Sequence, residues 1–261
     1  MADYVVGVSA GIAYGVSYLS GQPRRNLEVV TRYAPDRRYM GMNNLADKRN
    51  RCYFGLKFAY DTIPNKLVPF DYDAFAAYPG QVEAVVTNLN TGKADYLPVL
   101  RRDRQATVIQ ASCAMPLLFP IYHLDGQPYL DGGVADAIPW KRALEAGCDR
   151  VVVILTRERG YQKEPETLMP LFRRVYRKYP AFVEDLRTRA ERYNESRKEL
   201  FQLEQEGRIL VIEPRDTRGF SRTERDREKL LAMWQEGFFA GRKAAEAVRA
   251  FWTEPCLPEK L

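Results

Sequence analysis

A short segment near the amino terminus constrains the fold more than any other part of the chain. Residues 7–11 read Gly-Val-Ser-Ala-Gly, a G-x-S-x-G sequence between an apolar run at Val5-Val6 and a helical pattern reaching about Leu19. In this context a serine lies on a sharp strand-to-helix turn that exposes its hydroxyl, and small flanking residues allow close backbone packing. Chance would supply roughly 0.02 such pentapeptides in a chain of this composition. We therefore predict a nucleophile elbow with Ser9 at its tip.

The elbow also predicts how negative charge would be stabilised beside Ser9. Backbone N–H groups at a helix amino terminus are free, and the helix dipole favours an anion there. The N–H of Ala10 is therefore a candidate oxyanion donor, and Gly7 and Gly11 shape the turn. Two other readings are a glycine-rich turn capped by its serine and a phosphate-binding loop, although no lysine follows the glycines.

A serine hydroxyl needs a general base, and the sequence offers two sources for it. The single histidine, His123, could form a triad with Ser9 and either Asp71 or Asp73. The alternative is Asp131, because Gly132 and Gly133 let the backbone bend sharply and bring the carboxylate close to another loop. We favour a dyad of Ser9 and Asp131.

Strand and helix patterns alternate along the chain and predict an α/β fold. Strands are expected at 82–87, 94–100, 121–124, 128–130, 151–155 and 209–212, and helices at 139–147, 170–206 and up to about 252. We expect residues 1–165 to form a catalytic core and residues 166–261 a mostly helical part of the same domain.

Composition narrows the classes of partner and compartment. The chain has no apolar run long enough to span a membrane and no signal-peptide pattern, so we expect a cytoplasmic protein, with contact at the membrane periphery as a further reading. The scattered cysteines, Cys52, Cys113, Cys148 and Cys256, suggest neither a zinc site nor a disulfide framework. The net charge of +6 suits an anionic partner. Much of the excess positive charge lies in one helical stretch, which indicates either a solvated helix face or a surface for anionic lipid. The basic residues of this stretch are Arg173, Arg174, Arg177, Lys178, Arg187, Arg189 and Arg192.

Together these motifs resemble the patatin-like phospholipases. Residues 6–11 resemble the serine motif of that family and residues 131–133 its D-G-G motif, while residues 86–92 and 111–120 resemble segments that lie between them. The resemblance implies a three-layer α/β/α sandwich with a mostly parallel central sheet and a Ser9–Asp131 dyad that needs no metal or cofactor. It also implies a phospholipid or other acyl-ester lipid as substrate.

One family feature is missing from the sequence. The family begins with a strand and a glycine-rich, arginine-containing oxyanion loop ahead of the elbow, and this chain contains no Gly-Gly-Gly run. We therefore expect the sequence to be truncated at its amino terminus. A catalytically inactive module that binds lipid or protein is the main alternative to a hydrolase, and acyl transfer to an acceptor other than water is another. Nucleic-acid binding is not expected, since charge alone supports it.

Overall fold

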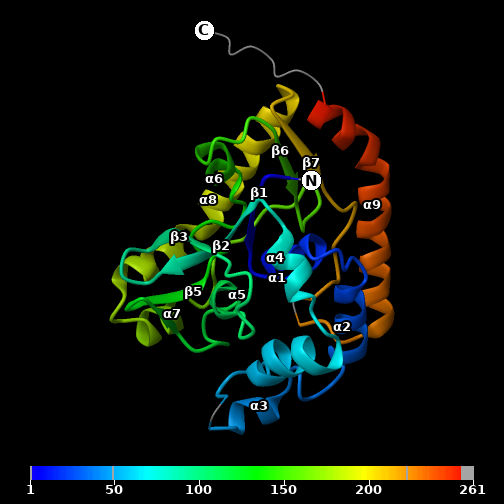
Figure 1. Ribbon diagram of the computed structural model, residues 1–261. Helices are drawn as coiled ribbons and strands as arrows, with labels where there is room; N and C mark the ends of the chain where they lie inside the picture. The colour runs from blue at the N-terminus through cyan, green and yellow to red at the C-terminus, as the bar shows by residue number, and fades with distance from the viewer. Residues whose placement is uncertain (1, 49, 222, 254–261) are drawn as a thin grey trace.

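The structure is a computed structural model that describes residues 2–48, 50–221 and 223–253. The strands in these ranges are β1 (Tyr4–Val8), β2 (Gln81–Asn88), β3 (Lys93–Pro98), β4 (Tyr122–Leu124), β5 (Gln127–Asp131), β6 (Val151–Ile154) and β7 (Ile209–Ile212). The helices are α1 (Ala10–Leu19), α2 (Arg25–Tyr33), α3 (Met42–Ala46), the π-helix η1 (Phe58–Leu67), α4 (Tyr72–Ala77), α5 (Thr107–Ser112), α6 (Trp140–Glu145), α7 (Met169–Val175), α8 (Pro180–Gln205) and α9 (Arg227–Thr253). Figure 1 shows their arrangement. The predicted α/β class is confirmed.

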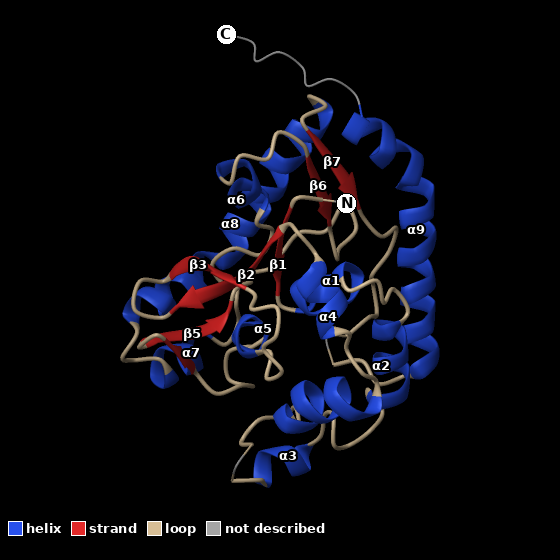
Figure 2. Cartoon of the chain, in the orientation of Figure 1, coloured by secondary structure: helices blue, strands red, loops and turns tan. Residues whose placement is uncertain are grey.

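The β2 strand organises the five-stranded sheet. One edge of β2 pairs with β3 over residues 83–88. β1 and β5 therefore both pair with the opposite edge of β2. Along that edge β1 runs parallel to β2 and ends with Val8 opposite Val85, whereas β5 runs antiparallel and ends with Asp131 opposite Val86. The ends of β1 and β5 therefore meet at neighbouring positions of β2 (Figure 2).

The predicted mostly parallel central sheet is wrong for the described part of the chain. Of the pairings in the five-stranded sheet, β1 with β2 is parallel, and the others are antiparallel. Tight hairpins account for two of these pairings, β2 with β3 and β4 with β5, because a short turn can join only antiparallel neighbours. Gly92 has a φ of 67° in one turn, and Asp125 and Gly126 have φ values of 48° and 76° in the other. The parallel pair β6 and β7 forms a separate sheet, and the three-layer arrangement stays a prediction.

Apolar side chains cover both faces of β1 and fix the strand that leads to Ser9. Val5 packs in a cluster with Ile12 of α1, and Tyr4 and Val6 pack on the opposite side against a cluster containing Trp140 and Leu200. This alternation follows from the two-residue period of a strand. Ile12 is fully buried, and burial of an isoleucine side chain contributes roughly 1.5–3 kcal/mol to the free energy of unfolding.

The predicted helix at 170–206 is two helices in the structure. Pro180 is the first residue of α8, and it separates this helix from α7 because proline has no N–H for the preceding turn. Phe182 and Leu186 of α8 are buried in one cluster with Leu130 of β5. Within the described ranges, no helix has the length and apolar character needed to cross a membrane.

The meeting point on β2 predicts opposite effects for two motif glycines. A Cβ on Gly132 would lie 2.1 Å from the Val85 carbonyl oxygen, whereas a Cβ on Gly11 would meet nothing within 4 Å. We expect Gly132→Ala to lower the free energy of unfolding by about 2–3 kcal/mol or more, since the backbone must move. Gly11 lies in α1, where alanine is more favourable than glycine, so Gly11→Ala should raise the free energy of unfolding by roughly 0.5–1 kcal/mol. Urea unfolding measures both, and equal effects would contradict the close approach at Gly132.

Candidate active site

Ser9 occupies a strained turn between β1 and α1. Its φ of 52° and ψ of −125° fall outside the regions that a serine normally adopts, at a cost of about 1–3 kcal/mol. The turn is tight: the backbone of Gly7 passes so close to that of Ile12 that a Cβ on Gly7 would lie 2.8 Å from it. Ser9 is the N-cap residue of α1, yet its side chain makes no capping hydrogen bond. The reading of Ser9 as a simple helix cap is therefore wrong.

The Ser9 hydroxyl bonds to a carboxylate from the end of β5. Ser9 Oγ donates to Asp131 Oδ2 at 2.8 Å. The other carboxylate oxygen, Oδ1, accepts the Gly133 N–H at 2.7 Å, and Asp131 is 6% exposed. One oxygen is thus held by the backbone, while the other faces the hydroxyl. The structure brings together Ser9, Asp131 and the flanking glycines that the sequence identified as site residues.

The end of α5 links the two sides of this site. The buried Ser112 hydroxyl accepts the Ser9 N–H at 2.9 Å, and the carbonyl of Ala114, two residues later, accepts the Asp131 N–H at 2.8 Å. One short segment therefore fixes both backbones. The sequence did not identify Ser112 as a site residue, because a single serine at a helix end carries no signal of what it contacts.

The Thr87 side chain of β2 hydrogen-bonds the turn that follows Asp131. Its fully buried hydroxyl donates to the Asp131 carbonyl at 2.8 Å and accepts the Ala135 N–H at 3.1 Å. A threonine hydroxyl can both donate and accept a hydrogen bond, and the Thr87 hydroxyl does both here. Thr87 lies in an apolar strand pattern, so its sequence context predicted a core position and no role in the site.

Cys113 is a second nucleophilic group beside Ser9. Desolvation, followed by the charge of Asp131, raises the pKa of its thiol to about 12, although side-chain interactions with Tyr60 and Ser9 act in the opposite direction. The thiolate is the reactive form of cysteine. At neutral pH the thiol therefore stays protonated, and Ser9 is the better candidate nucleophile. Cys52 and Cys148 are also free thiols, and Cys256 lies outside the described residues.

The amino terminus of α1 follows directly after Ser9 and begins at Ala10. Ala10 is the first residue of this ten-residue helix and is exposed. Its N–H has no acceptor within the helix, since the first four N–H groups of a helix lack one. A developing oxyanion on a group attached to Ser9 Oγ could use this donor and the positive end of the dipole. In the part of the chain that the structure describes, no cluster of acidic, histidine or cysteine side chains is suited to a metal ion.

A cavity of about 150 Å³ begins at Ala13, one turn after Ser9 on α1. It is lined by residues of α1, α2, η1, α4, α5 and the segment before α5. Its apolar members include Val16, Val29, Ile63, Phe75 and Ile109, and its charged members are Arg25, Arg101 and Asp103. Tyr60, which hydrogen-bonds to Cys113, also lines it and connects it with the site. An apolar cavity of this size can hold a group of roughly six carbon atoms.

The residues of the alternative triad have other positions. His123 is exposed in β4, opposite Pro128 of β5. Asp71 caps α4 by accepting the Ala74 N–H, and Asp73 forms an exposed ion pair with Arg102. The Ser9 hydroxyl bonds directly to Asp131 instead, so the geometry favours the two-residue arrangement.

Comparison with known proteins agrees with this architecture. Residues 1–144 match the model of a family described as patatin-like phospholipase, and residues 179–253 match a domain of unknown function, DUF6363. Among curated proteins, the chain is 28% identical over 167 residues to "Uncharacterized protein YjjU" of Escherichia coli strain K12. That alignment covers 59% of this chain and 43% of the relative, so the chain spans less than half of the relative's length.

The raised pKa of Cys113 predicts a slow thiol in the folded protein. A pKa of about 12 in place of the ordinary 9.0 leaves about 1,000-fold less thiolate at pH 8. We expect iodoacetamide to alkylate Cys113 at least 100-fold more slowly in the native protein than in 8 M urea, measured by peptide mass spectrometry. Equal rates in the two conditions would show that the thiol is not desolvated as described.

Proposed function

The chain belongs to the patatin-like phospholipase family, a family of lipid hydrolases, and we propose that it hydrolyses acyl esters of phospholipids or lysophospholipids. The observation that carries this proposal is the 2.8 Å hydrogen bond from Ser9 Oγ to Asp131 Oδ2. A hydroxyl needs a base within this distance to become a nucleophile. Ser9 is the proposed nucleophile and Asp131 the proposed general base.

In the first half of the reaction, Ser9 Oγ attacks the ester carbonyl carbon and its proton passes to Asp131 Oδ2. The hydrogen bond from the Gly133 N–H holds the other carboxylate oxygen, so the base keeps its orientation while the proton moves. The carbonyl oxygen becomes an oxyanion, which the Ala10 N–H and the α1 dipole stabilise. Collapse of this intermediate releases the alcohol, which takes the proton from Asp131, and leaves an acyl-serine.

In the second half, Asp131 accepts a proton from water as the water oxygen attacks the acyl-serine. The new tetrahedral intermediate collapses, and Ser9 Oγ recovers its proton as the carboxylic acid leaves. The cavity that begins at Ala13 supports a lipid substrate, because it could take part of an acyl chain close to Ser9. An acceptor other than water at this stage would give acyl transfer from the same intermediate.

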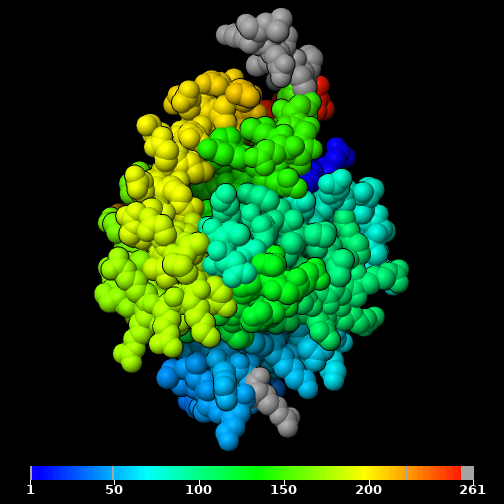
Figure 3. All heavy atoms as spheres, turned by 90° about the vertical axis from the view of Figure 1, so that its left-hand side faces the viewer, coloured from blue at the N-terminus to red at the C-terminus, as the bar shows by residue number. Residues whose placement is uncertain are grey.

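A basic and apolar surface on α7 supports contact with an anionic membrane. Leu168, Leu171 and Val175 are 50%, 44% and 52% exposed. Around them lie exposed cations, Arg173, Arg174, Arg177 and Lys178. Phe172 and Tyr176 of the same segment point inward and are buried. Such a surface suits an interface where apolar side chains enter the lipid and cations meet its head groups. Figure 3 shows this yellow-green segment on the face that also carries β3 and the β4–β5 hairpin.

An inactive module that binds lipid or a protein partner is the second candidate function. It is favoured because, among the residues that the structure describes, we assign one oxyanion donor, the N–H of Ala10 at the start of α1. Loss of a single oxyanion donor costs about 100- to 1,000-fold in rate. A folded protein that binds lipid vesicles but never forms a covalent adduct at Ser9 would support this candidate.

Covalent labelling with an alkyl fluorophosphonate tests the dyad. We expect the purified protein to form an adduct at Ser9, because the probe reacts with an activated serine. Ser9→Ala should abolish the adduct, and Asp131→Asn should slow it by about 100- to 10,000-fold, since the base is lost. Intact-protein and peptide mass spectrometry measure both.

Two controls sharpen this experiment. Cys113→Ala should leave labelling in place, since the thiol is not the proposed nucleophile. A probe with a six-carbon alkyl chain should react faster than a methyl probe if the cavity accepts the chain. Labelling that survives Ser9→Ala would refute the assignment of the nucleophile.

Vesicle cosedimentation tests the α7 surface. We expect binding to vesicles with 30% phosphatidylglycerol and much weaker binding to pure phosphatidylcholine, because cations drive the contact. Removing two charges with Arg173→Gln and Arg174→Gln should cost about 2 kcal/mol, or roughly 30-fold in affinity. The matched control is Arg242→Gln with Lys243→Gln, two exposed cations of α9. Equal losses in both double variants would indicate net charge alone and contradict a specific surface.

A further inference from the structure

We infer that α8, at the start of the segment matched by the domain of unknown function, positions the proposed general base by clamping the turn that follows Asp131. Two arginines of α8, Arg189 and Arg192, bond the carbonyls of Gly133, Val134 and Ala135. These residues lie more than 50 positions along the chain from the turn that they hold. The inference rests on the proposed function and gives this segment a role in it.

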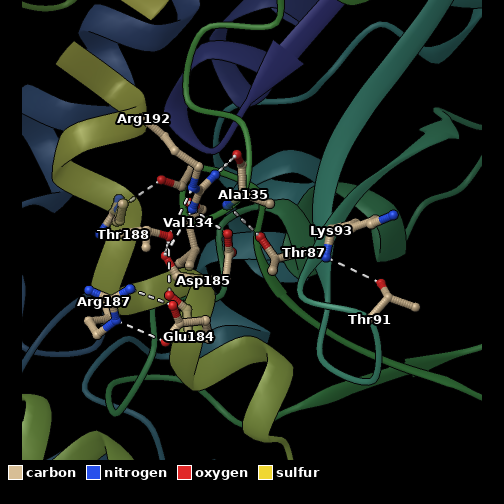
Figure 4. Close-up of polar contacts among 12 residues, drawn as sticks. Thr87, Thr91, Lys93, Val134, Ala135, Glu184, Asp185, Arg187, Thr188 and Arg192 are labelled. Carbon is tan, nitrogen blue, oxygen red and sulfur yellow. Dashed lines mark hydrogen bonds and ion pairs between the residues drawn. The ribbon is translucent and has the colours of Figure 1, made fainter. Parts of the chain in front are cut away.

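The contacts involve three consecutive carbonyls. Arg189 Nε donates to the Gly133 carbonyl at 2.7 Å. The Arg192 guanidinium donates to Ala135 at 2.7 Å and to Val134 at 3.2 Å. The two arginines are three positions apart on α8, so they lie on one face of the helix. Figure 4 shows Arg192 reaching from α8 to the turn at Val134 and Ala135.

Asp185 orients Arg192 toward the turn. Its carboxylate Oδ1 is paired with the Arg192 guanidinium, and its own carbonyl accepts from the same nitrogen at 2.9 Å. Asp185 is 8% exposed, and burial raises its pKa to about 6, so the carboxylate is ionised at neutral pH and above. Thr188 accepts from Arg192 Nε at 3.2 Å and completes the set of contacts. The guanidinium is therefore fixed on the α8 side before it meets the turn.

The clamp acts on the same backbone that holds the carboxylate. The Gly133 N–H bonds Asp131 Oδ1, while the carbonyl of Gly133 bonds Arg189. The Ala135 N–H bonds Thr87, while the carbonyl of Ala135 bonds Arg192. The turn is thus held through its N–H groups by Asp131 and β2 and through its carbonyls by α8. We assign Arg189 and Arg192 as positioning residues, because the contacts described above bond the backbone carbonyls of the turn that carries Asp131.

Methionine substitutions keep an unbranched side chain that reaches about as far as arginine Nε but remove the guanidinium donors, and so test the clamp. We expect Arg189→Met and Arg192→Met to lower kcat for p-nitrophenyl butyrate by about 10- to 100-fold with KM within about 2-fold, since a small misplacement of the base slows chemistry more than binding. Arg192→Lys should recover part of the loss, because an ammonium keeps the positive charge and hydrogen-bond donors but lacks the planar fork that reaches two carbonyls in a fixed geometry. The matched control is Arg187→Met, on the same helix but paired with the exposed Glu184.

Amide hydrogen exchange of the full chain gives a readout that does not depend on activity. In Arg189→Met and Arg192→Met the peptide covering residues 131–136 should exchange at least 10-fold faster, while peptides from β6 and β7 and the Arg187→Met protein stay unchanged. If the wild type shows no esterase activity and exchange still rises in 131–136, the clamp is upheld and the proposed function fails. Exchange in 131–136 that matches the Arg187→Met control, or that rises equally throughout the chain, would overturn the clamp.

Discussion

The edge of β2 at Val85 and Val86 is the constraint on which the whole site depends. β1 arrives there in parallel and β5 in the antiparallel direction, so both strands end at adjacent positions and their next residues must share one space. Ser9 leaves that space through a strained turn into α1, and the chain after Asp131 leaves it past the Val85 carbonyl, where only a glycine fits. The pairing of β1 and β5 with β2 therefore brings together two residues separated by 122 positions.

The sequence predicted those parts of the site whose signals are local. The elbow and the strands expected at 121–124 and 128–130 follow from glycine positions and strand patterns, and they match β1, β4 and β5. The region from α2 to α4 gave no such signal, and it contains a π-helix with Pro64 inside it, which no periodicity argument would predict. Sheet direction was missed because strand patterns do not reveal which edge of β2 each strand joins.

Charge patterns were the least informative part of the sequence, because the same residue type serves different ends. Arg173 and Arg174 are exposed on α7, Arg187 pairs with Glu184 at the surface, and Arg189 and Arg192 bond backbone carbonyls. All five occur in one basic, helical stretch, which predicted a solvated or lipid-facing surface. Arg173 and Arg174 lie on α7, and the phase of α8, which begins at Pro180, separates Arg187 from Arg189 and Arg192.

The boundary between the two family matches does not coincide with a boundary in the packing. Phe182 and Leu186 of α8 share a cluster with Leu130, and Leu200 shares another with Tyr4 and Val6 of β1. The strands that carry Ser9 and Asp131 thus bury their apolar faces partly against α8. Polar contacts also join α8 to the segments that follow two strands. Arg197 bonds the carbonyls of Glu158 and Arg159 after β6, and Arg189 and Arg192 bond carbonyls of the turn after β5. Because one rigid helix holds the backbone after two strands, its removal would release the turn at Asp131 and the apolar support of β1 together.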